Sequence, residues 1–123
     1  MGRWEAGYAI LMGMELSKKR CIPCEGNVPP LTRPEAETLL AELQGWKLDD
    51  DAREIKKQYT FKDFDETMKF VNEIAKIAEE EAHHPDLDVS YGKLGVELTT
   101  HAIGGLSQND FILAAKIDSI PRA

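Results

Sequence analysis

The feature that most constrains the fold is a helical repeat enclosed by two stretches of alternating residues. Residues 54–61 alternate in a two-residue period with one largely apolar face, and so do residues 87–91 and 94–100 on either side of Gly92. This is the period of β-strands that bury one side. Between the two stretches, residues 64–78 place apolar side chains at helical spacing. We therefore expect strands on both sides of a long central helix.

A shorter helix should precede the first strands. Thr32 and Glu35 have the spacing of a capping box, which predicts a helix through Leu43 that Gly45 ends. Trp46 should then begin a strand that leads, through an acidic turn, into the alternating stretch that starts at residue 54.

The central helix should begin at Asp63, with Glu66 three residues later. Its last turn is acidic, which opposes the helix dipole; Glu79 is kept as a site candidate, whereas Glu80 and Glu81 are assigned to solvent. The apolar residues expected to face the sheet are Phe64, Met68, Val71, Ala75 and Ala78.

A hairpin and a final helix complete the pattern. Gly92 permits a tight turn between a strand carrying Leu87, Val89 and Tyr91 and a second strand carrying Leu94, Val96, Leu98 and Thr100. Ser107 with Asp110 resembles a further helix start. The order α-β-β-α-β-β-α predicts an α+β fold, a four-stranded antiparallel sheet with helices packed on one face.

All three histidines lie near the end of the central helix and of the last strand. His83 and His84 precede Pro85, and His101 follows the alternating stretch. Histidine titrates near pH 6.5, so the cluster indicates proton transfer or metal binding. The alternative is that the pair only ends a helix and His101 is an ordinary half-buried residue. Adjacent helical residues point about 100° apart, which disfavours a shared metal ion.

The spacing of these residues resembles the signature of the pterin-4a-carbinolamine dehydratase family. The signature positions are Glu79, His83, His84, Pro85, Tyr91, His101 and Asp110. The similarity extends from C-I-P-C at residues 21–24 and V-P-P-L-T at residues 28–32, through Gly45 and Trp46, to about Ile120.

The resemblance implies a hydro-lyase that removes water from 4a-hydroxytetrahydropterin to give quinonoid dihydropterin. His83 and His101 would be the proton-transfer pair, with their acid and base roles unassigned, and His84 would mainly hold the pterin. No metal or organic cofactor is expected. The resemblance assigns substrate binding or orientation to Glu79, Pro85, Thr99, Thr100 and Asp110.

The same resemblance implies a homo-oligomer, dimer or tetramer, and a functional link to an aromatic amino-acid hydroxylase. The alternative is a non-catalytic pterin-binding or protein-interaction module, because mammalian members also bind a homeodomain transcription factor. The net charge of −7 and pI near 4.9 argue against direct binding to nucleic acid or an anionic membrane. A cytoplasmic location is expected.

The length of 123 residues fits one domain, expected to be the dehydratase domain at residues 21–123. Residues 1–20 are expected to be an N-terminal extension, disordered or lightly docked, in which Met14 offers a second start and the apolar residues 8–12 are too few to span a bilayer. Cys21 and Cys24 are compatible with a zinc site or a redox pair, but a thiol-bearing loop is the favoured interpretation.

Overall fold

The computed structural model describes residues 16–22 and 28–122, and its element order is the predicted one. Within the described residues, one helix precedes the first two strands, another lies between them and the hairpin, and another follows the hairpin. The elements are α2 (Arg33–Leu40), β1 (Lys47–Leu48), β2 (Ile55–Thr60), α3 (Phe64–Glu81), β3 (Asp86–Val89), β4 (Lys93–Leu98), a 3-10 helix (His101–Ile103) and α4 (Gln108–Asp118).

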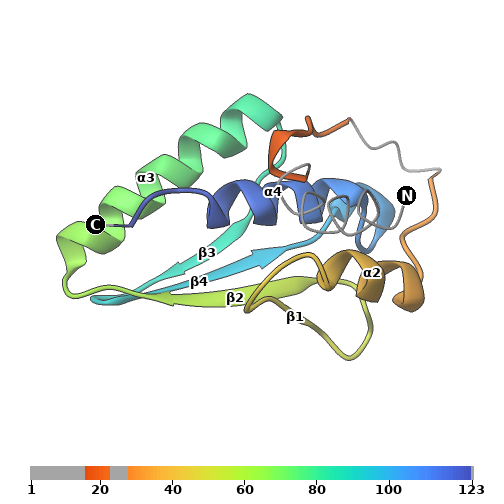
Figure 1. Cartoon of the computed structure of the whole chain (residues 1–123), viewed down its shortest axis with the longest axis horizontal. Helices are drawn as coiled ribbons and strands as arrows, with labels where there is room; N and C mark the ends of the chain where they lie inside the picture. Colours follow the sequence, from red (N-terminus) through yellow and green to blue (C-terminus); the bar gives the residue numbers. More distant parts are fainter. Residues whose placement is uncertain (1–15, 23–27, 123) are drawn as a thin grey trace, which may run out of the picture.

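The strands form one antiparallel sheet in the order β1-β2-β4-β3. The register of β2 and β4 places Tyr59 opposite Leu94, and that of β3 and β4 places Leu87 opposite Val96. Figure 1 shows α3 and α4 on the same side of the sheet. The predicted α+β class, with helices on one face of a four-stranded antiparallel sheet, is confirmed.

The core lies between the covered face of the sheet and the helices. Along β4, Leu94, Val96 and Leu98 are fully buried, which confirms the predicted alternation. Helix α4 is buried on nearly all sides from Asn109 to Ala115, because it contacts both α2 and α3. A helix in this position holds its first turn rigidly, and that turn contributes to the site described below.

The buried face of α3 differs in part from the predicted one: Ala78 is buried and Val71 packs against the core as expected, but the other predicted residues do not define the buried stripe. Phe64 is 49% exposed and Ala75 is also exposed. The buried stripe is Thr67, Phe70, Ile74, Ala78 and Glu81. Both sets have helical spacing, so periodicity alone did not fix the rotation of the helix. The polar Thr67 fits inside because the carbonyl oxygens of Asp63 and Tyr91, at 2.9 and 3.0 Å, share its single hydroxyl proton.

Two element ends also differ from the expectation. Helix α2 stops at Leu40 rather than Leu43, and residues 42 and 43 continue with tighter i to i−3 hydrogen bonds before Gly45, whose φ is +80°. The third strand stops at Val89, so Tyr91 lies in the hairpin turn and is 69% exposed.

Residues 16–20 contact the domain, although they were expected to belong to the N-terminal extension. Leu16 is buried in the core, and the Lys116 ammonium group donates to the carbonyl of Ser17. Residues 1–15, which include Met14 and the apolar patch, lie outside the described residues.

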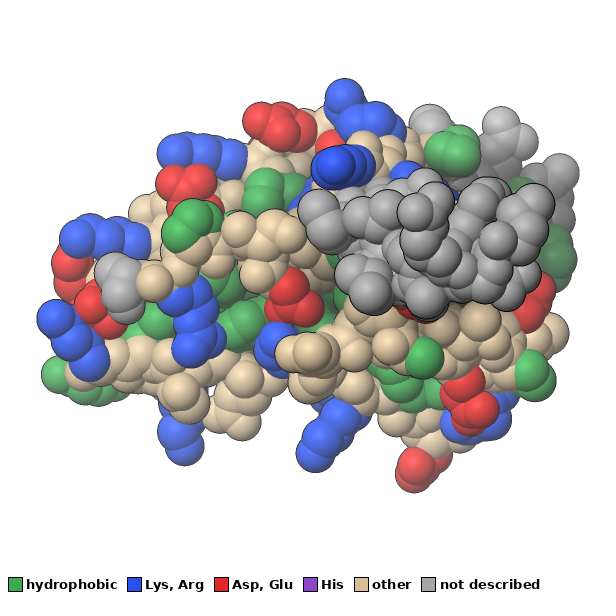
Figure 2. Space-filling model, in the orientation of Figure 1, with side chains coloured by type: hydrophobic (Ala, Val, Ile, Leu, Met, Phe, Trp, Pro, Cys, Tyr) green, Lys and Arg blue, Asp and Glu red, His purple; other side chains and the backbone are tan. Residues whose placement is uncertain are grey.

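The surface carries both signs of charge. In Figure 2, basic and acidic side chains lie next to one another. Along α3 and its N-terminal flank, Lys62, Lys69 and Lys76 each pair with a nearby carboxylate. In the described part of the chain, each helix is too short or too polar to cross a bilayer.

Candidate active site

The three histidines line one pocket of about 480 Å³, together with Thr99 and Thr100. The pocket lies where the C-terminus of α3, the 3-10 helix and the first turn of α4 meet, and Cys21 and Ile22 complete its lining. This volume falls within the range of small-molecule sites. His83 and His101, which are eighteen residues apart in the sequence, thus line the same pocket.

The end of α3 directs the histidine pair away from the helix axis. Ala82 adopts a left-handed conformation, with φ 52° and ψ 38°, and the amide of His83 donates to the carbonyl of Ala78. This is the arrangement that commonly closes a helix, although glycine is the usual residue at such a position. Pro85 follows and cannot continue the helix.

His83 is held by a buried carboxylate. Its Nε2 atom lies 2.6 Å from Oδ1 of Asp110, whose side chain is fully buried. The other carboxylate oxygen accepts from the Thr100 hydroxyl at 2.8 Å and from the Ser107 amide at 3.0 Å. Since Thr100 donates its only hydroxyl proton to Asp110, the Ser107 hydroxyl must donate to Thr100. Asp110 therefore fixes the His83 ring while also capping α4.

His84 and His101 are more accessible than His83. Nε2 of His84 lies 2.6 Å from Oε2 of Glu79, and both side chains are exposed. The His101 side chain is 79% exposed, and its Nε2 atom is 4.0 Å from Oδ2 of Asp86. The pocket therefore has one anchored imidazole at its wall and two at its rim.

The remaining predicted site residues occupy supporting positions. Glu79 and Asp110 contact the pocket through the histidines they hold, and Pro85 lies outside the lining. The Thr99 hydroxyl donates to the carbonyl of Arg53. Tyr91, a position of the signature, lies in the β3–β4 turn, and its carbonyl accepts from Thr67.

Glu81 was assigned to solvent, and this was wrong: it is buried beside the pocket. It accepts from the Cys21 amide at 2.7 Å and pairs with Arg20 at 3.0 Å and Lys116 at 3.8 Å. Burial by itself would raise the pKa of Glu81, but the Cys21 hydrogen bond and the two cations outweigh it and hold the pKa below its usual value. Its place three residues after Ala78 on the buried stripe was the signal that could have identified it.

Asn109 is the second residue that the sequence did not indicate. Its side-chain carbonyl accepts from the Ile22 amide at 2.9 Å, and its amide group donates to the Ile22 carbonyl. The Cys21 thiol lies 3.7 Å from the Asn109 backbone oxygen. Cys24 is outside the described residues, and those described hold no cluster of three side chains suited to a metal ion.

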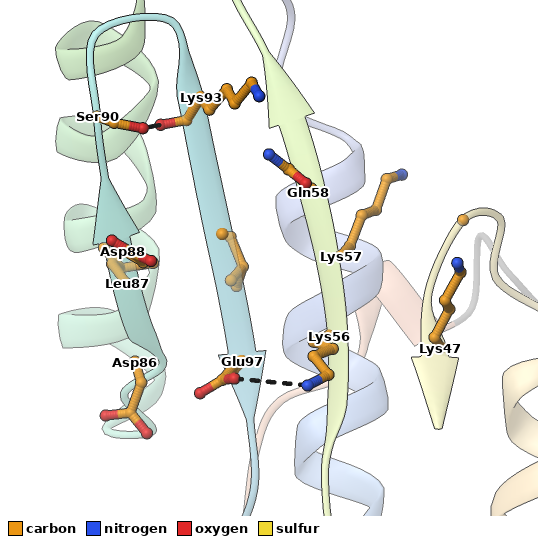
Figure 3. A pocket seen from close by; sticks show the side chains of 13 residues that line it. Lys47, Lys56, Lys57, Gln58, Asp86, Leu87, Asp88, Ser90, Lys93 and Glu97 are labelled. Atoms are coloured by element: carbon orange, nitrogen blue, oxygen red, sulfur yellow. Dashed lines mark hydrogen bonds and ion pairs between the residues drawn. The ribbon is translucent and has the colours of Figure 1, made fainter. Parts of the chain in front are cut away.

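A second hollow of about 480 Å³ lies on the uncovered face of the sheet (Figure 3). Lysines from β1, β2 and β4 share it with Asp86, Asp88 and Glu97, and Lys56 pairs with Glu97 at 3.9 Å. It contains no histidine. The pocket at the end of α3 is therefore the better candidate for proton-transfer chemistry.

Fold and pocket together define a small α+β protein with a histidine-lined pocket, and comparisons with known proteins identify its family. Residues 29–120 match the family model for pterin 4 alpha carbinolamine dehydratase. A relative from Nitrosomonas eutropha, provisionally named pterin-4-alpha-carbinolamine dehydratase, is 52% identical over 107 residues, 86% of this chain and 93% of its own. A relative of the same name from Rickettsia canadensis is 53% identical over 105 residues, 85% and 95% of the two chains.

Solved structures give the same result. A transcriptional coactivator/pterin dehydratase from Brucella melitensis superposes with a TM-score of 0.70 at 32% identity, covering 73% of this chain and 96% of that one. A pterin dehydratase-like protein identified as a RuBisCO assembly factor in the alpha-carboxysome shares the fold, with a TM-score of 0.54 at 19% identity, covering 62% and 88% of the two chains. The chain belongs to the pterin-4α-carbinolamine dehydratase family, a family of hydro-lyases.

Proposed function

We propose that the pocket at the end of α3 catalyses the dehydration of 4a-hydroxytetrahydropterin to quinonoid dihydropterin. The observation that supports it most directly is the convergence of His83, His84 and His101 on one pocket, in a chain of this family. The hydrogen bond between His83 and the buried Asp110 adds a second support, because a positioned imidazole is a general acid or base that needs no reorganisation.

The reaction requires two proton transfers and no redox step. A proton is delivered to the hydroxyl on C4a, the C4a–O bond breaks and water leaves. The proton on N5 passes to a base, and the electrons of the N5–H bond complete the C4a=N5 double bond. Positioned acid and base residues contribute about a hundredfold to ten-thousandfold each.

We assign His83 and His101 to the proton-transfer pair and His84 mainly to holding the pterin. Asp110 acts as a positioning residue through His83, and Glu79 acts in the same way through His84, since each carboxylate lies 2.6 Å from its imidazole. Pro85 fixes the direction in which the pair leaves α3.

The ring edge of the pterin would bond to backbone groups around Thr99 and Thr100, because the hydroxyls of both residues already bond within the protein. A small-molecule ligand oriented by backbone groups and two or three side chains is the usual arrangement in such pockets.

The test is the ultraviolet decay of 4a-hydroxytetrahydropterin generated in situ by an aromatic amino-acid hydroxylase. We expect the His101→Ala variant to keep its fold, because the His101 side chain is largely exposed, and to turn over at least about a hundredfold more slowly. Tyr91→Phe is the control, since Tyr91 belongs to the signature but lies away from the pocket lining. A His101→Ala rate within a few-fold of the parent would remove His101 from the mechanism.

We further propose a homo-oligomer. β3 is an edge strand of the sheet, and pairing it with a second copy would satisfy its outer backbone groups. Service to an aromatic amino-acid hydroxylase and a cytoplasmic location stay predictions.

If 4a-hydroxytetrahydropterin decays at the uncatalysed rate in the presence of the protein, the proposed function becomes pterin binding or protein interaction without turnover.

A further inference from the structure

Residues 20–22 form a wall of the pocket that lies outside the part matched by the family model. Cys21 and Ile22 line the pocket with the three histidines, whereas the matched region begins at residue 29. In Figure 1 this red segment lies beside the end of α3. These residues precede the region matched by the family model but line the same pocket as the histidines, so they are candidates for setting how this chain binds its ligand.

Two buried polar side chains hold this wall in place from two different helices. Asn109, in the first turn of α4, bonds both backbone polar groups of Ile22. Glu81, in the last turn of α3, accepts from the Cys21 amide and pairs with Arg20. Both side chains are more than nine-tenths buried. Buried polar groups with matched partners fix a backbone far more firmly than exposed ones do.

The two holding residues are neighbours of the proposed catalytic machinery. Asn109 directly precedes Asp110, which holds His83, and Glu81 lies two residues before His83 itself. Residues 20–22 are thus tied to the same two helix ends that place the anchored imidazole. Their distance from the histidines is consequently set by rigid elements and not by a free loop.

Ile22 is an apolar residue of the pocket lining, and it is 68% exposed. Its position is fixed through backbone hydrogen bonds and not through burial of its own side chain. A large apolar group held in this way beside polar imidazoles offers a surface for the hydrocarbon part of a ligand.

In a reduced pterin the pyrimidine side carries polar groups, and the hydrocarbon edge is C6 with its substituent and C7. C6 is bonded to N5, the atom that must reach a histidine. We propose that Ile22 contacts this C6–C7 edge in the bound substrate and thereby sets its KM, with Asn109 as the positioning residue for Ile22. This inference rests on the proposed dehydration for the identity of the substrate.

The experiment compares Ile22→Ala with the parent, using the 4a-hydroxy adduct of 6-methyltetrahydropterin generated in situ. Loss of a modest apolar contact should raise KM about fivefold, with kcat changed less than twofold, because isoleucine takes no part in proton transfer. Val28→Ala is the matched control: Val28 is an exposed apolar residue of the same region that does not line the pocket, so both constants should stay at the parent values. An unchanged KM for Ile22→Ala would overturn the proposal.

A second variant tests the role of Asn109. Asn109→Ala should raise KM by a similar factor. The KM of the double variant Ile22→Ala/Asn109→Ala should exceed that of either single variant by no more than about twofold, because both substitutions remove the same contact. A thermal scan confirms that each variant is folded. If the increases in KM of the two single variants multiply in the double variant, Asn109 does not act by positioning Ile22.

Binding is measured separately, so that failure of the wall and failure of the proposed reaction can be told apart. Calorimetric titration with 6-methyl-7,8-dihydropterin, a stable relative of the product, should give a dissociation constant about fivefold higher for Ile22→Ala. A fivefold rise in the dissociation constant for Ile22→Ala, with no turnover by the parent protein, would support the ligand contact of Ile22 and refute the proposed dehydration. If the parent turns over the substrate and Ile22→Ala has the parent's KM and dissociation constant, only the proposed contact of Ile22 is refuted.

Discussion

Replacing Glu81 by glutamine removes a buried charge while keeping the shape of the side chain. In the native protein the Glu81 carboxylate accepts from the Cys21 amide and lies near two cations, Arg20 and Lys116. A glutamine oxygen can still accept from the amide, but its NH₂ group then faces the two cations, which are also donors. We expect a loss of stability that arises from charge and not from packing.

The size of this loss follows from the contacts. A hydrogen bond to a charged acceptor exceeds a neutral one by about 1 kcal/mol. The Arg20 side chain is largely exposed, so its ion pair with Glu81 contributes about 0.5 kcal/mol at most. Lys116 is mostly buried and loses its only nearby carboxylate among the described residues, at a cost of about 0.5–1 kcal/mol. The free energy of unfolding should therefore fall by about 2 kcal/mol, and the Tm by about 8 °C.

The loss should depend on pH in a defined direction. The folded-state pKa of Glu81 lies below that of an unfolded glutamate, about 4.3. The carboxylate therefore contributes its full stabilisation above the unfolded pKa, and the contribution disappears as the pH falls through the lower, folded pKa. The difference between parent and Glu81→Gln should be about 2 kcal/mol at pH 7 and should shrink at acid pH.

Urea unfolding followed by tryptophan fluorescence measures this difference at pH 7 and at the lowest pH where the native state persists. Glu80→Gln is the control, because it makes the same charge change at the exposed neighbouring residue and should alter stability by less than about 0.5 kcal/mol. A Glu81→Gln difference at pH 7 no larger than that of the control, or one of constant size at both pH values, would refute the reasoning.

Two further predictions concern the hairpin and the assembly. Gly92→Ala should destabilise the protein by about 2 kcal/mol in urea unfolding, because a Cβ atom would lie 2.7 Å from the Phe61 carbonyl oxygen. Gly95→Ala in β4, where the nearest atom would be 3.6 Å away, should cost much less; equal losses would contradict the steric argument. Sedimentation at working concentration should show a dimer or tetramer, and a monomer would refute the proposed pairing of β3.

The local signals in the sequence located the elements well. The predicted helix starts are confirmed: Thr32 with Glu35 and Ser107 with Asp110 form capping boxes that open α2 and α4, and the Asp63 side chain caps α3 by accepting from the Glu66 amide. A capping box involves residues only three apart, so the sequence contains all the information it needs. The alternation along β4 was equally reliable, because a strand beside a core must bury every second residue.

The rotation of α3 was not determined in the same way. Its apolar and small residues form two neighbouring stripes, and the buried one contains Thr67 and Glu81. Each of these polar residues is satisfied by groups far away in the sequence, Tyr91 for Thr67 and Cys21 for Glu81. A residue that looks solvent-exposed by type can be buried when a distant partner satisfies it.

The sequence by itself determined the order of the elements, the helix starts and the family, because these depend on periodicity, caps and fixed spacing of a few residues. It also identified the three histidines as the group to examine. Only the tertiary structure decided that Asp110 supports His83, that Glu81 is buried and that residues 20–22 complete the pocket. Each of these depends on contacts between segments 27 to 88 residues apart, and such contacts form only when the core fixes the helix ends against one another.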